Sequence, residues 1–468
     1  MTLSFHGATR TVTGSKHLLQ LADGTKILLD CGMFQGNPKE ADELNRDWGF
    51  EPREIDFLIL SHAHVDHCGL IPKLIADGYA GKVYCTPATY DLARILLLDS
   101  ARIQEQDVYY HNKKRLKRGE PPIKGLYDEA DVNRALKEFI EVGYGQEVVL
   151  KEGVSFHFTD VGHIIGSAAV HLKIQTDNGT KTLTFSGDVG RYNDELLRAP
   201  ETFPQADYLI LESTYGDSLH EDISIKDQKL LDCITHTCVE KKGRLIIPAF
   251  SVGRTQELIY ALNRLDVSKS LPPIDFFVDS PLSVEATGIM KQHQQELNER
   301  FKEFLRIDKE PFEFKRLHYI TDAVDSKALN ARKGPCVIIS ASGMADAGRV
   351  KHHIKHAISD PRNTILFVGY CEPNSLGGKL MRNYREVTLF GEPFQVKAEI
   401  QSMRSMSAHG DYEDLCQFIA CQQPALVKQL FLVHGEYDTQ LTFKSKLLRK
   451  GFPQVEIPGR HQIIELIA

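Results

Sequence analysis

Long hydrophobic segments are absent from this sequence of 468 residues, and no apolar run approaches the ~18 residues that cross a bilayer. The N-terminus lacks a basic region followed by an apolar one, so we expect no secretory signal. The nine cysteines are scattered and odd in number, which predicts reduced thiols in a cytoplasmic protein. The sequence also has no repeat and no low-complexity tract. Together these absences exclude the membrane, fibrous and disordered classes.

Positive charge is in the minority. Lys and Arg number 56 against 63 Asp and Glu, which gives a formal net charge of −7. This balance argues against a protein that binds nucleic acid with its whole surface, but it leaves room for a local basic groove. The length predicts about two to three domains. Histidine is the unusual residue, because nineteen are present and several of them are clustered.

The pattern of apolar residues divides the chain into three parts. Over 1–206, alternating runs such as 18–21 and 26–30 flank an Asp-Gly turn, which predicts hairpins and two packed sheets. Over 207–393, short continuous apolar runs alternate with segments of helical spacing, which predicts an α/β domain with a mainly parallel sheet. Hairpin-like runs return over 394–468. We therefore expect an α/β fold in which one domain is inserted into another.

The densest group of metal-binding side chains is the hexapeptide His-Ala-His-Val-Asp-His at residues 62–67, directly after an apolar run. His62 and His64 are two residues apart, so they point the same way on an extended segment. Asp66 and His67 fall where the chain turns toward a predicted helix. Four such ligands within six residues can serve two adjacent divalent ions.

This hexapeptide resembles the signature of the metallo-β-lactamase superfamily. The wider pattern is similar to its β-CASP branch of RNA-processing nucleases, which includes the mRNA 3′-end processing endonuclease and RNase J. The resemblance extends over nearly the whole chain. It implies an α/β fold in which a metallo-β-lactamase αββα sandwich carries an inserted α/β β-CASP domain.

Three residues outside the hexapeptide match further motifs of the superfamily. Asp30 in Leu-Leu-Asp-Cys-Gly resembles a supporting aspartate behind the metal loop. His163 in Asp-Val-Gly-His-Ile-Ile-Gly-Ser resembles the third motif, whose histidine is a metal ligand. Asp188 in Phe-Ser-Gly-Asp resembles the fourth motif, whose aspartate bridges the two ions.

Three more motifs are typical of the β-CASP nucleases rather than of other superfamily hydrolases. Glu212 in Leu-Glu-Ser-Thr-Tyr-Gly matches the acidic first motif. His409 in Ser-Ala-His-Gly-Asp matches the second, and His434 in Val-His-Gly-Glu matches the third.

The resemblance implies two sets of metal ligands. One ion would be bound by His62, His64, His163 and Asp188. The other would be bound by Asp66, His67, Asp188 and His434. Imidazole-rich sites suit zinc, so we expect two Zn²⁺ ions, with Mn²⁺ and Fe as alternatives.

A pair of divalent ions can stabilise both reacting oxygens of an in-line displacement at phosphorus. We take Asp66, Glu212 and His409 as catalytic residues, with His409 as a general acid that Glu212 keeps protonated. The resemblance implies a ribonuclease, acting as an endonuclease or a 5′→3′ exonuclease. This ribonuclease would hydrolyse RNA in the cleft between the two domains and leave a 5′-phosphate and a 3′-hydroxyl.

Two other functions are considered. A hydrolase of a small ester, thioester or phosphodiester is disfavoured by the inserted domain and by the three β-CASP motifs. A catalytically silent RNA-binding subunit is disfavoured because the chain retains every expected metal ligand.

Phosphate contacts are expected from two loops. Ser342 and Gly343 follow an apolar run in a loop of small residues, which matches the family's phosphate-holding loop. The segment 371–380 departs from the family pattern, but Ser375 keeps a hydroxyl and Lys379 supplies the local cation. We include all four residues as candidate phosphate contacts.

A basic stretch runs from Arg102 to Lys124, with seven basic and three acidic residues, a local charge of +4. Two interpretations stay open, a solvated helix face or part of a rim that guides RNA. In the second case, replacing Lys113, Lys114 and Arg115 should weaken RNA binding and reduce its salt dependence. A homodimer is also consistent with the resemblance, whereas no membrane partner is expected.

Overall fold

The computed structural model describes residues 1–221, 225–369, 371–372, 374–403 and 406–466. In this part of the chain, every helix is too short or too polar to cross a bilayer. All nine cysteines are free thiols, and seven of them are buried.

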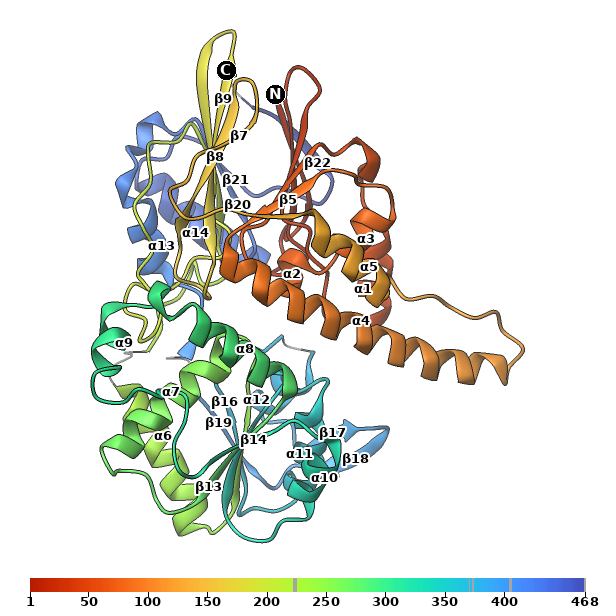
Figure 1. Cartoon of the computed structure of the whole chain (residues 1–468), viewed down its shortest axis with the longest axis vertical. Helices are drawn as coiled ribbons and strands as arrows, with labels where there is room; N and C mark the ends of the chain where they lie inside the picture. The colour runs from red at the N-terminus through yellow and green to blue at the C-terminus, as the bar shows by residue number, and fades with distance from the viewer. Residues whose placement is uncertain (222–224, 370, 373, 404–405, 467–468) are drawn as a thin grey trace. The chain divides into compact units, whose positions relative to one another are not determined.

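The chain forms two compact units (Figure 1). The first unit consists of Met1–Asp194, Arg198–Leu219 and His409–Ala468. The second consists of Glu195–Leu197 and His220–Ala408. The first unit is therefore discontinuous in sequence, and most of the second is inserted into it.

The first unit contains two seven-stranded sheets. One has the strand order β22-β1-β2-β3-β4-β5-β6. Its strands are β1 (Thr2–Gly7), β2 (Lys16–Gln20), β3 (Lys26–Leu29), β4 (Phe57–Ile59), β5 (Lys82–Cys85), β6 (Phe139–Glu141) and β22 (Gln462–Glu465). The predicted hairpin is confirmed, since β2 and β3 pair antiparallel and Leu21 N donates to Thr25 O at 2.8 Å.

The other sheet of this unit has the order β21-β20-β11-β10-β9-β8-β7. Its strands are β7 (Val148–Lys151), β8 (Val154–Asp160), β9 (Ala168–Thr176), β10 (Gly179–Phe185), β11 (Tyr208–Glu212), β20 (Gln429–Val433) and β21 (Val455–Glu456). Strands β7 to β10 pair antiparallel, whereas β10, β11, β20 and β21 pair in parallel.

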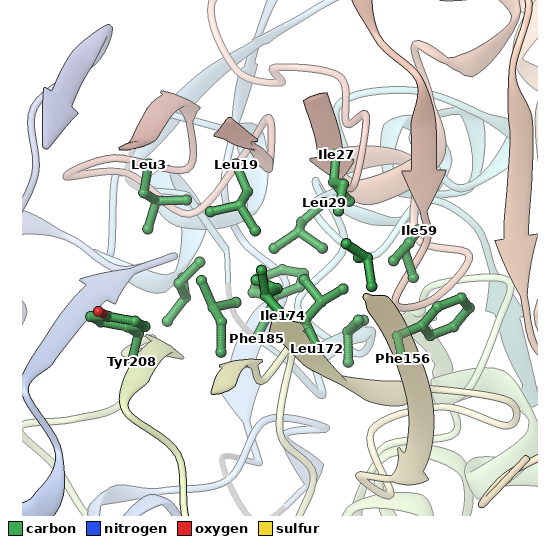
Figure 2. Packing of buried hydrophobic residues seen from close by; sticks show 14 of the residues in the cluster. Leu3, Leu19, Ile27, Leu29, Ile59, Phe156, Leu172, Ile174, Phe185 and Tyr208 are labelled. Carbon is green, nitrogen blue, oxygen red and sulfur yellow. The ribbon is translucent and has the colours of Figure 1, made fainter. Parts of the chain in front are cut away.

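The two sheets pack face to face over one apolar core (Figure 2). The labelled side chains of this core are Leu3, Leu19, Ile27, Leu29, Ile59, Phe156, Leu172, Ile174, Phe185 and Tyr208. Strand β8 shows the cause, because Val154, Phe156 and Phe158 are buried while Ser155 and His157 between them are partly exposed. This period of two turns one face of the strand toward the opposite sheet.

Helices cover the outer faces of both sheets (Figure 1). The helices of this unit are α1 (Pro38–Arg46), α2 (Val65–Cys68), α3 (Ile71–Ala76), α4 (Pro87–Leu116), α5 (Glu129–Ala135), α13 (Tyr412–Phe418) and α14 (Tyr437–Arg449). A second apolar cluster joins the outer face of the β8–β11 sheet to α13 and α14, through Leu209, Leu432, Phe418 and Phe443. The layers form the αββα sandwich that the resemblance implied.

The second unit is built around a six-stranded sheet, and all its neighbouring strands pair in parallel. In spatial order its strands are β14 (Leu317–Ile320), β13 (Asp275–Asp279), β15 (Cys336–Ser340), β12 (Arg244–Pro248), β16 (Thr364–Phe367) and β19 (Glu399–Ser402). A separate hairpin pairs β17 (Glu386–Leu389) with β18 (Glu392–Gln395). The mainly parallel sheet expected for the inserted domain is therefore present.

Seven α-helices are found among the described residues of the second unit. They are α6 (Lys226–Ile234), α7 (Arg254–Val267), α8 (Pro281–Gln292), α9 (Glu299–Phe304), α10 (Ala323–Ala331), α11 (Arg349–Ala357) and α12 (Leu376–Met381). The apolar cluster of this unit joins Ile338 and Ile365 on the sheet to Ile354 on α11 and Leu380 on α12.

The limits of the units differ from the domain limits drawn from the sequence, which were 206/207 and 393/394. Strand β11 lies after the first predicted limit, yet it pairs with β10 and β20 in the first unit. Strand β19 lies after the second predicted limit, yet it pairs with β16 in the second unit. The hairpin texture expected after 394 was also wrong for β19 and β20, because both pair in parallel with their sheet neighbours.

Candidate metal centre and catalytic pair

The candidate ligands follow the carboxyl ends of strands in the first unit. His62 and His64 follow β4, His163 follows β8, Asp188 follows β10 and His434 follows β20. Strands β10, β11 and β20 run in parallel, so their ends lie at the same edge of their sheet. The fold thereby brings together side chains that lie several hundred residues apart in sequence.

Asp66 and His67 lie in α2, a helix of a single turn. Backbone hydrogen bonds hold this turn, because Ser15 N donates to Asp66 O and Cys31 N donates to His67 O, both at 2.8 Å. Gly32 allows the close approach, since a Cβ at this position would lie 1.6 Å from Asp66 O. Two chain segments, at Ser15 and at residues 31–32, therefore fix the position of this helical turn.

The first predicted ligand set is brought together. His64 Nδ1 lies 3.1 Å from His62 Nε2 and 3.1 Å from His163 Nε2. Asp188 Oδ2 lies 3.5 Å from each of those two Nε2 atoms. One donor atom from each of the four residues lies within 4.8 Å of all the others, which can hold a metal ion.

The second predicted set is brought together beside the first. Asp66, His67 and His434 form another group of donors within 4.8 Å, and His434 Nε2 lies 3.4 Å from Asp66 Oδ2. The other oxygen of Asp188, Oδ1, lies 3.3 Å from His67 Nε2 and 3.6 Å from His434 Nδ1. Asp188 therefore directs one oxygen toward each group, as a bridging ligand requires.

Asp30 orients His67 from behind. This fully buried carboxylate accepts hydrogen bonds from Ser61 N at 2.8 Å, Ser61 Oγ at 2.9 Å and Ser15 Oγ at 3.1 Å. Its Oδ2 also lies 2.6 Å from His67 Nδ1. A proton on Nδ1 leaves Nε2 of His67 free to bind a cation, which is the usual role of a carboxylate behind a metal-bound histidine.

The donors fit divalent cations on electrostatic grounds. Burial lowers the pKa of His62 and His163 well below the usual value, and it lowers the pKa of His64 to about 4. These imidazoles are therefore neutral at pH 7 and keep a lone pair for a metal. At His67 burial acts in the same direction, but Asp188 and Asp30 outweigh it and raise the pKa.

Two buried atoms at the centre of the cluster are left without a hydrogen bond. They are His67 Nε2 and Asp188 Oδ1, which face one another. Buried polar atoms in proteins nearly always have a partner, so this pair is explained if both atoms bind a cation.

A buried carboxylate and a histidine form a pair next to these donors. Glu212 Oε1 accepts from Val189 N at 2.7 Å and lies 3.0 Å from His409 Nδ1. Its Oε2 accepts from Thr214 N at 3.1 Å. His409 Nε2 faces the cluster, 3.9 Å from Asp188 Oδ2. Two backbone amides thus fix Glu212, and Glu212 fixes the ring of His409.

The environment of His409 favours its protonated form. Burial alone would lower its pKa, but Glu212 and then Asp188 raise it to about 9. The structure also groups His409 with Asp188 and His434 within ligand distance of one another. The sequence motifs place His409 outside both sets of ligands, whereas the structure groups it with two of them. Its assignment as an acid rather than a ligand therefore stays a prediction.

Sequence reasoning missed the hydroxyl groups that position the site. They are Ser15, Ser61, Ser167 and Thr214. Thr214 Oγ1 lies 3.0 Å from His434 Nδ1, and Ser167 Oγ accepts from His163 N at 3.0 Å. Ser61, Ser167 and Thr214 lie inside or beside the motifs already identified, whereas Ser15 carries no such signal.

The four candidate phosphate contacts lie in the second unit. Their two segments meet there, because Gly377 N donates to Met344 O at 3.0 Å. Ser375 caps α12, since its Oγ accepts from Gly378 N and donates to Glu372 O.

The other amides at the start of α12 are also engaged within the chain. Leu376 N donates to Asp346 Oδ1 at 2.7 Å. The roles of Ser342, Gly343, Ser375 and Lys379 toward phosphate stay predictions.

Family comparison agrees with this geometry. Residues 17–229 match the metallo-beta-lactamase superfamily, residues 255–380 match the Beta-Casp domain, and residues 394–458 match the Zn-dependent metallo-hydrolase RNA specificity domain. The chain therefore belongs to the metallo-beta-lactamase superfamily and to its Beta-Casp branch, as the resemblance predicted. Together these matches identify the chain as a metal-dependent hydrolase.

Individual relatives are similar along nearly the whole of this chain. Ribonuclease TTHA0252 of Thermus thermophilus is 34% identical over 95% of this chain and 95% of its own. An RNase J-like protein of Methanocaldococcus jannaschii is 30% identical over 99% of both chains. Transcription termination factor FttA of Methanosarcina mazei is 30% identical over 95% of this chain and 68% of its own.

Proposed function

We propose that this protein is a metal-dependent ribonuclease that hydrolyses RNA phosphodiester bonds and leaves a 5′-phosphate and a 3′-hydroxyl. The observation that carries the proposal is the pairing of two adjacent donor groups, bridged by Asp188, with the buried Glu212–His409 pair. The match to an RNA specificity domain and the ribonuclease names of two relatives support RNA as the substrate.

Two zinc ions are the proposed cofactors. The first would be held by His62, His64, His163 and Asp188, and the second by Asp66, His67, Asp188 and His434. Imidazole nitrogen and carboxylate oxygen in these proportions suit Zn²⁺, with Mn²⁺ and Fe as the alternatives. When bound, divalent ions lower the pKa of water and stabilise negative charge on phosphoryl oxygens.

Side-chain exposure differs among the residues of the cluster. The side chains of His62, His163 and Asp188 are at most 2% exposed, whereas those of Asp66 and His409 are each 19% exposed. Among these five residues, Asp66 and His409 are thus the ones that an incoming substrate can contact most readily. We assign Asp66 to the attacking water and His409 to the leaving group.

The products follow from the roles of these two residues. Asp66 accepts a proton from the water while the oxygen of that water forms a bond to phosphorus. The bond from phosphorus to the ribose 3′-oxygen breaks, and His409 donates its Nε2 proton to that oxygen. The phosphate therefore stays on the 5′ end of the downstream fragment, and the upstream fragment ends in a 3′-hydroxyl. Glu212 stabilises the protonated imidazole and fixes its orientation.

Hydrolysis of a small ester, thioester or phosphodiester was the alternative from the sequence. The three β-CASP motif residues, Glu212, His409 and His434, lie together at the site and favour the nuclease. The cleft between the two domains as the RNA site, a homodimeric state and a cytoplasmic location stay predictions from the sequence.

The test is cleavage of RNA labelled at the 5′ end or the 3′ end, with metal analysis of the same preparation. We expect about two zinc ions per chain, cleavage that a chelator abolishes and zinc restores, and new ends that accept direct 3′ ligation. The sizes of the labelled products also distinguish endonucleolytic from 5′→3′ exonucleolytic action. An Asp188→Asn variant serves as the control for a contaminating nuclease, because it removes a charge shared by both ligand sets.

The proposal is wrong if the metal-loaded protein leaves RNA intact while it hydrolyses a small ester or thioester. It is also wrong if the activity is equal in the Asp188→Asn variant, because the measured nuclease would then be another protein.

A further inference from the structure

The distal part of α4 and the segment that follows it form an arm, defined here as residues 102–126. The proximal part of the helix is anchored in the first unit, where Leu92, Leu97 and Ala101 are buried. None of the described residues within the arm is buried. Figure 1 shows the helix extending beyond the rest of its unit before the chain returns along it. An element that buries so little apolar surface contributes little to the core.

The arm is nevertheless ordered by its own contacts. Asn112 Nδ2 donates to Ile123 O at 3.0 Å, and Ile123 N donates to Asn112 Oδ1 at 2.8 Å. One turn further along, Arg115 Nε donates to Pro121 O at 2.7 Å. These contacts tie one face of the helix to the returning segment. They also give Arg115 a structural role, so it is not a free cation.

The opposite face of the arm carries exposed cations and an aromatic ring. Tyr110, Lys113, Lys114 and Lys117 share this face, because helical spacing of three, four and seven residues places them on one side. The tyrosine is 62% exposed. Among the ion pairs and side-chain hydrogen bonds of the described residues, none involves these three lysines.

A hollow of about 280 Å³ lies before these lysines along the helix and reaches the face at Tyr110; it is lined by Arg102, Glu105, Gln106, Tyr109 and Tyr110. The arm therefore presents phosphate-binding cations, an aromatic ring for stacking and a recess beside that ring. This combination is typical of surfaces that bind single-stranded nucleic acid, in which bases stack on aromatic rings and lysines neutralise phosphates.

We infer that this face of the arm is a binding site for single-stranded RNA. This inference adds a second contact for the RNA substrate of the proposed ribonuclease, and it rests on that proposed function. The arm has a local charge of +4, although the whole chain has a net charge of −7. This concentrated positive charge favours a polyanion as the partner of the arm over an acidic surface on a copy of this chain.

The helix connects the arm directly to the part of the first unit that carries the candidate metal ligands. Near its first turn, Thr89 Oγ1 donates to Gly166 O at 2.8 Å, in the loop that carries His163. From Thr89 to Lys113 the helix rises by about 36 Å, at ~1.5 Å per residue. The arm would therefore hold a part of the RNA that is remote from the scissile bond, and only RNA long enough to reach both would use it.

The experiment compares two triple variants of the metal-loaded protein. The test variant carries Lys113→Ala, Lys114→Ala and Lys117→Ala. The control carries Lys39→Ala, Lys137→Ala and Lys450→Ala, three exposed lysines of the same unit that give the same change in net charge. Binding is measured by fluorescence anisotropy with a labelled phosphorothioate oligouridylate over a range of salt concentrations, and cleavage is measured with phosphodiester RNA.

We expect the test variant to bind at least tenfold more weakly at low salt. Its plot of log K against log salt should be less steep by about 2, since each lost single-strand phosphate contact removes ~0.7. Tyr110→Ala should weaken binding about tenfold with an unchanged salt slope, whereas Tyr110→Phe keeps the ring and should bind like the wild type. The control variant should behave as the wild type.

The inference is overturned if the test variant binds RNA with the affinity and salt slope of the control. That result is distinct from failure of the proposed function, in which the wild type itself fails to cleave RNA. Weaker binding in both triple variants alike would also overturn it, because net charge alone would then explain the loss.

Discussion

The carboxylate of Asp188 determines much of the site, because its two oxygens face two different groups of donors. The sequence could predict this bridging role since the residue lies in a recognisable motif at the end of an apolar run. It could not predict the hydrogen bond from Ser15 to Asp30, since that contact depends on which strands are neighbours. Motifs identify residues that perform chemistry, whereas the residues that orient them are defined by the fold.

His409 gives the sharpest prediction at this scale. His409→Ala should lower kcat by about 10²–10⁴-fold, because the leaving oxygen loses its proton donor. The content of bound metal should stay unchanged, since all seven proposed ligands are intact. The measurements are single-turnover cleavage of labelled RNA and metal analysis of the purified variant.

A matched variant, Glu212→Gln, keeps the hydrogen-bond acceptor of the pair but removes the charge. We expect an intermediate loss of kcat with metal content unchanged. If His409→Ala instead loses a metal ion, the grouping of His409 with Asp188 and His434 reflects ligation, and the assignment as an acid is wrong.

Among the elements, the hairpin of β2 and β3 was predictable because an Asp-Gly turn and its two strands lie within fifteen residues of sequence, 16–30. The assignment of β11 and β19 to their sheets could not be predicted from the sequence. Strand β11 is a short apolar run and β19 is a short, mostly polar one, and neither sequence indicates its sheet. Only their partners, β10 and β16, settle which sheet each strand joins. Strand pairing between distant segments leaves no local signal in one sequence.

The α2 turn gives a prediction at the element scale. Gly32→Ala should displace this turn, because the new methyl group would lie 1.6 Å from Asp66 O and 2.8 Å from His67 N. Metal affinity should fall at least tenfold, since the ligands in α2 move while every ligand side chain is retained. Competition with a fluorescent zinc chelator measures the affinity.

Gly143→Ala provides the control in the same unit, because a Cβ there meets only Gln146 Oε1 at 3.9 Å. It should bind zinc like the wild type. Equal zinc affinity in Gly32→Ala and Gly143→Ala would show that the close approach at Gly32 does not fix the metal loop.

For the whole molecule, the overall charge says little about the proposed partner, because it averages two different regions. The net value of −7 includes buried carboxylates such as Asp188 that would face bound cations, whereas the arm carries a local +4. The division into two units is equally important, since every predicted metal ligand lies in the first of them.

That division gives the last prediction. Removing the metal should destabilise the first unit. The carboxylates would remain buried without a cation that compensates their charge, and the neutral imidazoles would remain buried without a binding partner. An ion present at a hundred times its Kd adds about 2.7 kcal/mol of stability, which corresponds to roughly 5–10 °C in Tm for a unit of this size.

Hydrogen–deuterium exchange followed by mass spectrometry, with and without a chelator, locates the change. Faster exchange should appear in α2 and in the backbone after β8, β10 and β20, while β12, β13 and β15 of the second unit keep their protection. Asp188→Asn should bind metal poorly, so the chelator should have little further effect on this variant. Equal loss of protection in both units would show that the cluster does not stabilise the first unit selectively.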